Sequence, residues 1–136
     1  MSRRLKRLTT LTMHFTLTVK PFPVTIGVWC GAWEKESIRA FVETLDPEPG
    51  PLDPPEDNEL GFCYANLKMS AVIWLPCEPE TPKQIGILAH EAFHAAEIFA
   101  KSIGIKHSKD SSEFYAYLIG YVVTETLRRC GKKTVD

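Results

Sequence analysis

The sequence predicts an α+β fold in which a small, mostly antiparallel sheet packs on helices. Residues 11–20 alternate strictly between apolar and polar side chains, as a half-buried strand does. Residues 82–103 and 111–129 repeat apolar side chains at helical spacing. The expected order of elements is β-β-α-loop-β-β-α-α. This order keeps the two long helices together at the end of the chain instead of alternating them with strands.

Length and composition indicate one domain over residues 1–136, with a single core. The formal net charge of −1 does not favour nucleic acid or a membrane as a partner, and the basic ends are expected to be solvated tails. No apolar stretch is long enough to span a bilayer. The four cysteines lack CxxC spacing and no secretory signal follows the basic start, so we expect reduced thiols in the cytoplasm. Met13 is an alternative start, which would make residues 1–12 an upstream extension.

The first half of the chain is expected to form two strands, a short helix and a long loop. Pro21 and Pro23 end the first strand, and residues 24–29 form the second. Residues 32–45 have the apolar spacing of a short amphipathic helix. Residues 46–59 hold five prolines and six acidic residues, which predicts irregular structure. We interpret this segment as a surface loop, and a flap beside a cleft is the functional alternative.

The second half is expected to contain two strands and two long helices. Residues 61–67 and 71–75 have the bulk and branching of strands, and a hairpin through residues 68–70 would join them. Thr81, Pro82 and Gln84 resemble a capping box with proline at the first helical position, so a helix is expected over 82–103. A second helix is expected over 111–129, after a short polar connection.

The motif HEAFH at residues 90–94 lies in the middle of the first long helix. His90 and His94 are four residues apart, so both imidazoles lie on the same side of the helix and can converge on one metal ion. Glu91 can then reach a water molecule bound to that metal. This is the HExxH arrangement of zinc metallopeptidases, and it predicts a Zn²⁺ site.

A catalytic zinc usually has three protein ligands, so a third is needed. The downstream candidates are Glu97, His107, Asp110 and Glu113. Glu97 lies further along the same helix, which makes it a poor ligand, and pairing with Lys101 is its alternative role. Glu113 is the preferred candidate because the first turn of the second helix could bring its carboxylate to the metal. Its alternative role is a capping box with Asp110.

At these residues the chain resembles the gluzincin metallopeptidases, which have HExxH followed by a glutamate on a later helix. Glu113 follows His94 by nineteen residues. The small size resembles the minigluzincins, and residues 90–105 and 112–121 look like small HExxH proteins encoded by bacteriophages and prophages. The resemblance covers about residues 60–126. The resemblance implies a zincin-like fold with His90, His94 and Glu113 as zinc ligands and Glu91 as general base and acid. It also implies that the strand before the metal helix runs along the cleft, where a free edge could pair with an extended peptide.

The expected reaction is hydrolysis of a peptide or protein substrate by zinc-bound water. Glu91 would accept the proton of this water and pass it to the leaving amine. The oxyanion needs a hydrogen-bond donor, and Tyr117 is the first candidate because it lies one turn beyond Glu113. Tyr115, Tyr121 and His107 are further options, although each of these side chains could serve packing instead.

Two other classes of function remain open from the sequence. The first is a non-catalytic zinc-binding protein of a phage or prophage that acts by binding a host or phage protein. The second is a nucleic-acid-binding module that uses the basic ends, which the near-neutral charge and the lack of a binding motif disfavour. Turnover that depends on Glu91 would separate the enzyme from both alternatives.

Overall fold

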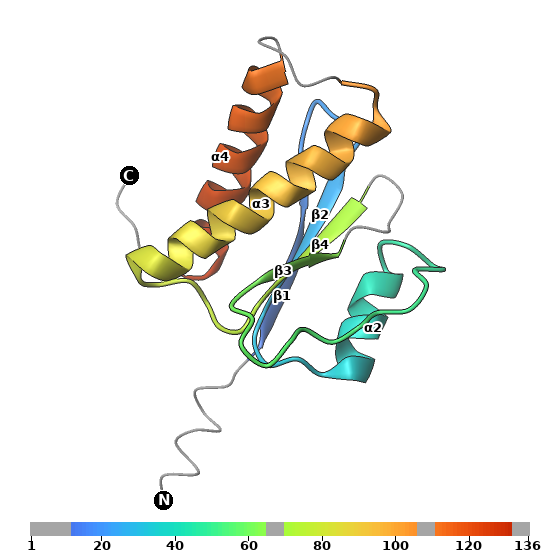
Figure 1. Ribbon diagram of the computed structural model, residues 1–136, viewed down its shortest axis with the longest axis vertical. Helices are drawn as coiled ribbons and strands as arrows, with labels where there is room; N and C mark the ends of the chain where they lie inside the picture. The colour runs from blue at the N-terminus through green and yellow to red at the C-terminus, as the bar shows by residue number, and fades with distance from the viewer. Residues whose placement is uncertain (1–11, 65–69, 106–110, 132–136) are drawn as a thin grey trace, which may run out of the picture.

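A computed structural model describes residues 12–64, 70–105 and 111–131 of the chain. Figure 1 shows a central sheet with two long helices on one face and a short helix on the other. The predicted α+β fold is confirmed. In chain order the elements are β1 (Met13–Thr18), β2 (Thr25–Cys30), α2 (Lys35–Glu43), β3 (Phe62–Tyr64), β4 (Ser70–Leu75), α3 (Pro82–Ser102) and α4 (Ser111–Arg129).

The four strands form one mixed, mostly antiparallel sheet in the order β1-β2-β4-β3. The pairs β1–β2 and β3–β4 are antiparallel, as expected for strands that follow each other in the chain. The central pair β2–β4 is parallel. Parallel neighbours need a crossover connection, and α2 with the loop after it belongs to this connection.

The sheet separates two hydrophobic clusters. Alternate side chains of a strand point to opposite faces. On one face Ile26 and Ile73 pack with α3 and α4, and on the other Trp29 and Trp74 pack with α2. The central strands β2 and β4 are therefore covered on both sides, which explains why they are almost continuously apolar.

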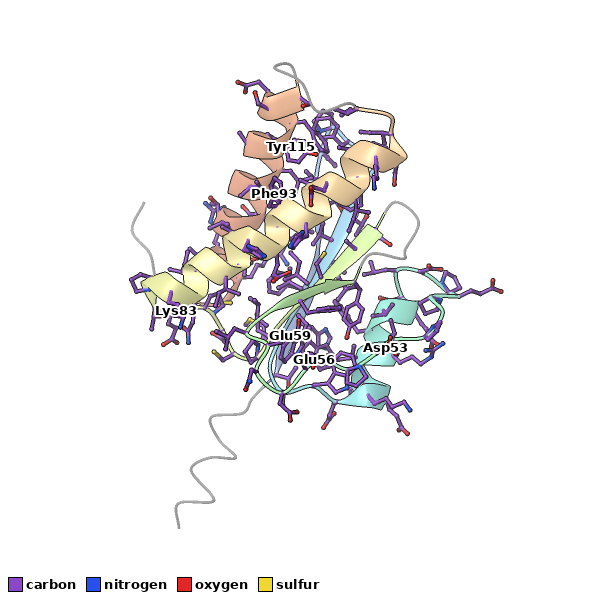
Figure 2. All side chains as sticks on the ribbon, in the orientation of Figure 1. Asp53, Glu56, Glu59, Lys83, Phe93 and Tyr115 are labelled. Atoms are coloured by element: carbon purple, nitrogen blue, oxygen red, sulfur yellow. The ribbon has the colours of Figure 1, made fainter. Side chains whose placement is uncertain are left out.

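The Pro-rich acidic segment 46–59 contains no helix or strand, as predicted. Two side chains of the regular elements donate hydrogen bonds to its backbone. Arg39 of α2 donates to the carbonyl of Gly50 at 3.1 Å, and the hydroxyl of Tyr64 in β3 donates to the carbonyl of Asp53 at 3.0 Å. The loop thus runs along the α2 side and then turns towards the end of the sheet below α3 (Figure 2).

The long helices match their predicted bounds closely, and the capping box at the start of α3 is confirmed. The amide of Gln84 donates to Oγ1 of Thr81 at 3.1 Å, and the amide of Thr81 donates to Oε1 of Gln84 at 3.1 Å. The expected hairpin turn falls largely in residues 65–69, outside the described residues, and Ser70 already belongs to β4. Among the helices of the described part, none is long and apolar enough to cross a membrane.

Candidate functional site

The two histidines of the HEAFH motif converge at their Nε2 atoms. His90 Nε2 and His94 Nε2 lie 3.1 Å apart, and both side chains are exposed. For comparison, two zinc–nitrogen bonds that meet at a tetrahedral angle place their nitrogens about 3.3 Å apart. The observed separation therefore fits a pair of imidazoles that share one zinc ion. This geometry follows from α3 itself, because an uninterrupted helix puts residues i and i+4 on one side.

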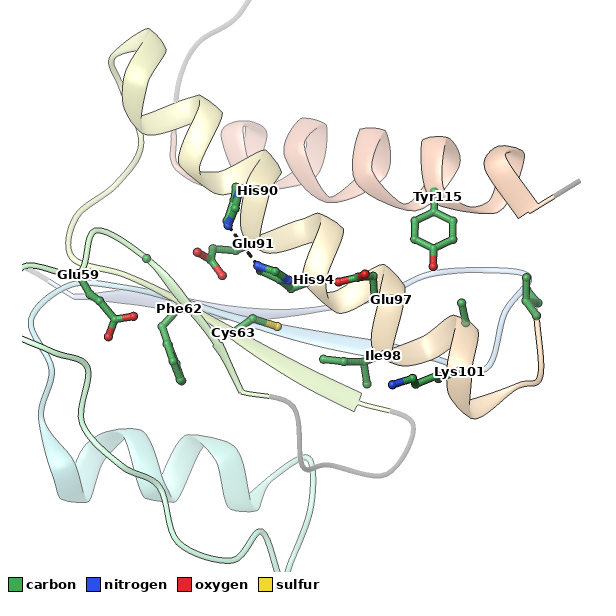
Figure 3. Close-up of a pocket in the computed structure, with 13 residues that line it drawn as sticks. Glu59, Phe62, Cys63, His90, Glu91, His94, Glu97, Ile98, Lys101 and Tyr115 are labelled. Carbon is green, nitrogen blue, oxygen red and sulfur yellow. Dashed lines mark hydrogen bonds and ion pairs between the residues drawn. The ribbon is translucent and has the colours of Figure 1, made fainter. Parts of the chain in front are cut away.

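Glu91 lies between the histidines and is buried, with 7% of its surface exposed. Figure 3 shows its carboxylate on the side of α3 that faces β3. Burial raises the pKa of the Glu91 carboxyl above its ordinary value, and the nearby His90 and His94 offset this effect only in part. Glu59, at the end of the acidic loop, raises the same pKa further. The position combines a poorly solvated carboxylate with access to the space beside the imidazoles, which suits a general base.

The backbone of Gly61 passes close to Glu91. The sequence analysis did not predict this contact. A Cβ atom at this position would lie 3.3 Å from Oε2 of Glu91 and 2.7 Å from Cγ2 of Ile87. Glycine therefore lets the chain cover the carboxylate. The only signal in the sequence is a glycine directly before a predicted strand, and that pattern has many other causes.

The histidines and Glu91 line a cavity of about 700 Å³. Beyond the motif, its walls come from the end of the acidic loop, β3, the second half of α3 and the start of α4. The site therefore includes the last residue of the segment that we interpreted as a surface loop. Besides the motif residues, the cavity is lined by Glu59, Gly61, Phe62, Cys63, Glu97, Ile98, Ala100, Lys101, Ile105 and Tyr115.

Strand β3, which borders the cavity, is the last strand of the described sheet. The resemblance implied that the strand directly before the metal helix runs along the cleft, and the sequence left open which strand forms the free edge. The strand before the helix is β4, which is paired on both sides, so the sheet edge beside the cavity belongs to β3. In β3 the side chain of Cys63 faces the α3 side of the sheet, and burial raises the pKa of its thiol to about 12. The thiol is thus expected to stay protonated near neutral pH.

Glu113 and Tyr117 do not line this cavity. Glu113 is exposed in the first turn of α4. Tyr117 is 46% exposed, and its hydroxyl donates to the carbonyl of Lys20 at 2.7 Å. The reason is the rotation of α4, which turns Tyr115 towards the cavity. Residues two positions away point to nearly the opposite side of a helix.

No group of three His, Cys, Asp or Glu side chains within residues 12–64, 70–105 and 111–131 is arranged to hold a metal ion. The described residues supply the pair His90 and His94. The other sequence candidates, His107 and Asp110, fall outside the described residues. The structure thus brings together the HExxH residues but does not bring Glu113 to them.

Tyr115, one of the lesser oxyanion candidates from the sequence, does line the cavity. Its ring packs on Phe93 with centroids 5.5 Å apart where α3 and α4 meet (Figure 2). Its hydroxyl points towards α3 near Glu97 (Figure 3). Burial, and then the charge of Glu97, raise the pKa of this hydroxyl, so it stays protonated near neutral pH.

Comparisons with protein-family models, with curated proteins and with solved structures found no significant match.

Proposed function

We propose that this protein is a zinc-dependent metallopeptidase, with His90 and His94 as zinc ligands and Glu91 as the general base. The observation that carries the proposal is the convergence of two imidazole Nε2 atoms, 3.1 Å apart, beside a buried carboxylate in a cavity of about 700 Å³. Zinc bound there would polarise the scissile carbonyl and lower the pKa of a water molecule. The volume lies in the range of ordinary ligand sites, about 300–1,000 Å³.

The side chains around the cavity have distinct roles in this proposal. Glu91 accepts a proton from the attacking water and donates it to the leaving amine. Tyr115 donates a hydrogen bond to the developing oxyanion. The outer edge of β3 pairs with an extended peptide through main-chain hydrogen bonds, beside the cavity wall formed by Phe62 and Cys63.

The third zinc ligand of the proposal comes from the chain after α3. The resemblance to gluzincins favours Glu113, but Glu113 does not line the cavity beside the histidines. His107 and Asp110 belong to the segment that joins α3 to α4, so they remain candidates. Each can be tested singly by the zinc content of its alanine variant.

The deciding experiment measures zinc content and peptide hydrolysis of the wild type and of Glu91→Gln. We expect about one zinc per chain in both proteins, because Glu91 is not a ligand. Turnover of an unstructured protein such as casein should fall by about 100-fold or more in the variant, since a general base contributes about 10²- to 10⁴-fold. Undiminished turnover by Glu91→Gln would remove Glu91 from the mechanism.

The same experiment tests the non-catalytic alternative, a zinc protein of a phage or prophage that binds a host or phage protein. The finding that favours it is that the described residues supply only two ligands, so a partner's side chain could complete the site. Zinc binding without turnover on any peptide would support this alternative against the enzyme.

A further inference from the structure

The imidazole of His94 has a neighbour at each of its nitrogens. Its Nε2 lies 3.1 Å from Nε2 of His90, and its Nδ1 lies 3.3 Å from Oε1 of Glu97. Glu97 is three residues further along α3, a spacing that brings side chains of one helix face together. We propose that Glu97 is a positioning residue that accepts the Nδ1–H of His94 and so directs the Nε2 lone pair of His94 towards the zinc position. This inference rests on the proposed function.

The contact at Nδ1 distinguishes a positioning role from a ligand role. Nδ1 and Nε2 lie on different sides of the imidazole ring, so a metal shared with His90 and a carboxylate at Nδ1 occupy opposite sides of His94. Figure 3 shows Glu97 beyond His94, on the side away from His90. Hydrogen bonds of this kind fix the tautomer and the orientation of metal-binding histidines. The sequence suggested Lys101 as the partner of Glu97, whereas the structure directs the carboxylate to His94.

The proposed role of Glu97 has a consequence for where the protons lie in the metal-free protein. A neutral imidazole carries one N–H group. If His94 carries its proton on Nδ1 for Glu97, its Nε2 is an acceptor, and the hydrogen bond at 3.1 Å requires His90 to donate from Nε2. The two histidines should therefore be opposite tautomers. Without Glu97 the choice of tautomer at His94 loses this constraint.

The first test measures the tautomers by two-bond ¹H–¹⁵N spectra of the metal-free, ¹⁵N-labelled full chain in mildly alkaline solution. We expect the Nδ1–H form at His94 and the Nε2–H form at His90 in the wild type. In Glu97→Ala the His94 signals should shift to a mixture of both forms. Glu43→Ala is the matched control, because Glu43 has the same charge and similar exposure, 45% against 46% for Glu97, on α2.

The second test measures zinc affinity by competition with a chromophoric chelator. Glu97→Ala should weaken zinc binding by about 10- to 100-fold, the usual effect of losing such a partner of a histidine ligand. Glu97→Gln keeps an acceptor oxygen, so it should recover part of the affinity and keep the Nδ1–H form at His94. Glu43→Ala should bind zinc as the wild type does.

Two results would overturn the positioning role. One is an unchanged His94 tautomer in Glu97→Ala. The other is a far larger loss of zinc affinity that Glu97→Gln does not relieve, which would make Glu97 a ligand. Failure of the proposed function would look different. The tautomers would be as expected and sensitive to Glu97, so the contact with His94 would stand, but the wild type would bind no zinc or cleave no peptide.

Discussion

Glu91 is the buried carboxylate between two exposed histidines, and the backbone of Gly61 passes close beside it. A Cβ at Gly61 would approach Cγ2 of Ile87 to 2.7 Å and Cγ of Glu91 to 3.2 Å. Both contacts are tighter than ordinary packing, so the loop or the side chains would have to move. The missing side chain therefore keeps Glu91 covered, and this cover contributes to the desolvation that raises the pKa of its carboxyl.

The variant Gly61→Ala should consequently lose stability and activity together. We expect a loss of about 1–3 kcal/mol in the free energy of unfolding, as for other overpacked sites, measured by chemical denaturation. Peptide hydrolysis should fall as Glu91 is displaced. Gly86→Ala, on the helix α3 that carries Glu91, is the control. An added Cβ at Gly86 meets nothing within 4 Å, and alanine is the better helix former. If Gly61→Ala were as stable and active as Gly86→Ala, the covering role of Gly61 would be wrong.

At the scale of elements, the rotation of α4 determines which of its side chains reach the site. Phe114, Leu118 and Val122 are buried, which fixes the orientation of the helix against the sheet and α3. Glu113 and Tyr117 share the opposite, exposed face. The burial pattern was partly readable in advance, because the apolar residues repeat at helical spacing. The need for a third zinc ligand favoured Glu113 despite that pattern.

Elements with local signals were predictable, and contacts between distant segments were not. The start of α3 is encoded by Thr81 and Gln84, and the convergence of His90 and His94 follows from their spacing on one helix. By contrast, three features depend on how distant segments pack. They are the parallel pairing of β2 with β4, the position of α2 on the opposite face of the sheet, and the approach of Gly61 to Glu91. Periodicity carries no information about such contacts.

The orientation of α4 leads to a prediction about zinc binding. Glu113→Ala should keep the wild-type zinc content, measured by elemental analysis of the purified protein, because Glu113 does not line the cavity that contains the histidine pair. His94→Ala should lose zinc. A loss of zinc in Glu113→Ala as well would show that α4 turns or shifts when the metal binds, and the three-ligand set implied by the gluzincin resemblance would then hold.

For the molecule as a whole, the sheet divides the packing into two layers with different roles. The candidate site is built from α3, β3, the loop end and α4. The layer on the other face consists of α2 and aromatic side chains such as Trp29 and Trp74. These layers share β2 and β4, so they should unfold together. Among the described residues of the α2 layer, only Phe62 of β3 also lines the cavity beside the histidines.

Gly27 of β2 tests this division. An added Cβ would lie 2.8 Å from Cδ1 of Leu45 and 2.9 Å from the ring of Phe41, so glycine lets α2 approach the sheet. Gly27→Ala should lower the free energy of unfolding by about 1–3 kcal/mol through this clash. Folded Gly27→Ala should still bind zinc with wild-type affinity, because the strain falls on the face away from His90 and His94. Reduced zinc affinity in the folded variant, measured by chelator competition, would show that packing under α2 also sets the geometry of the histidine pair.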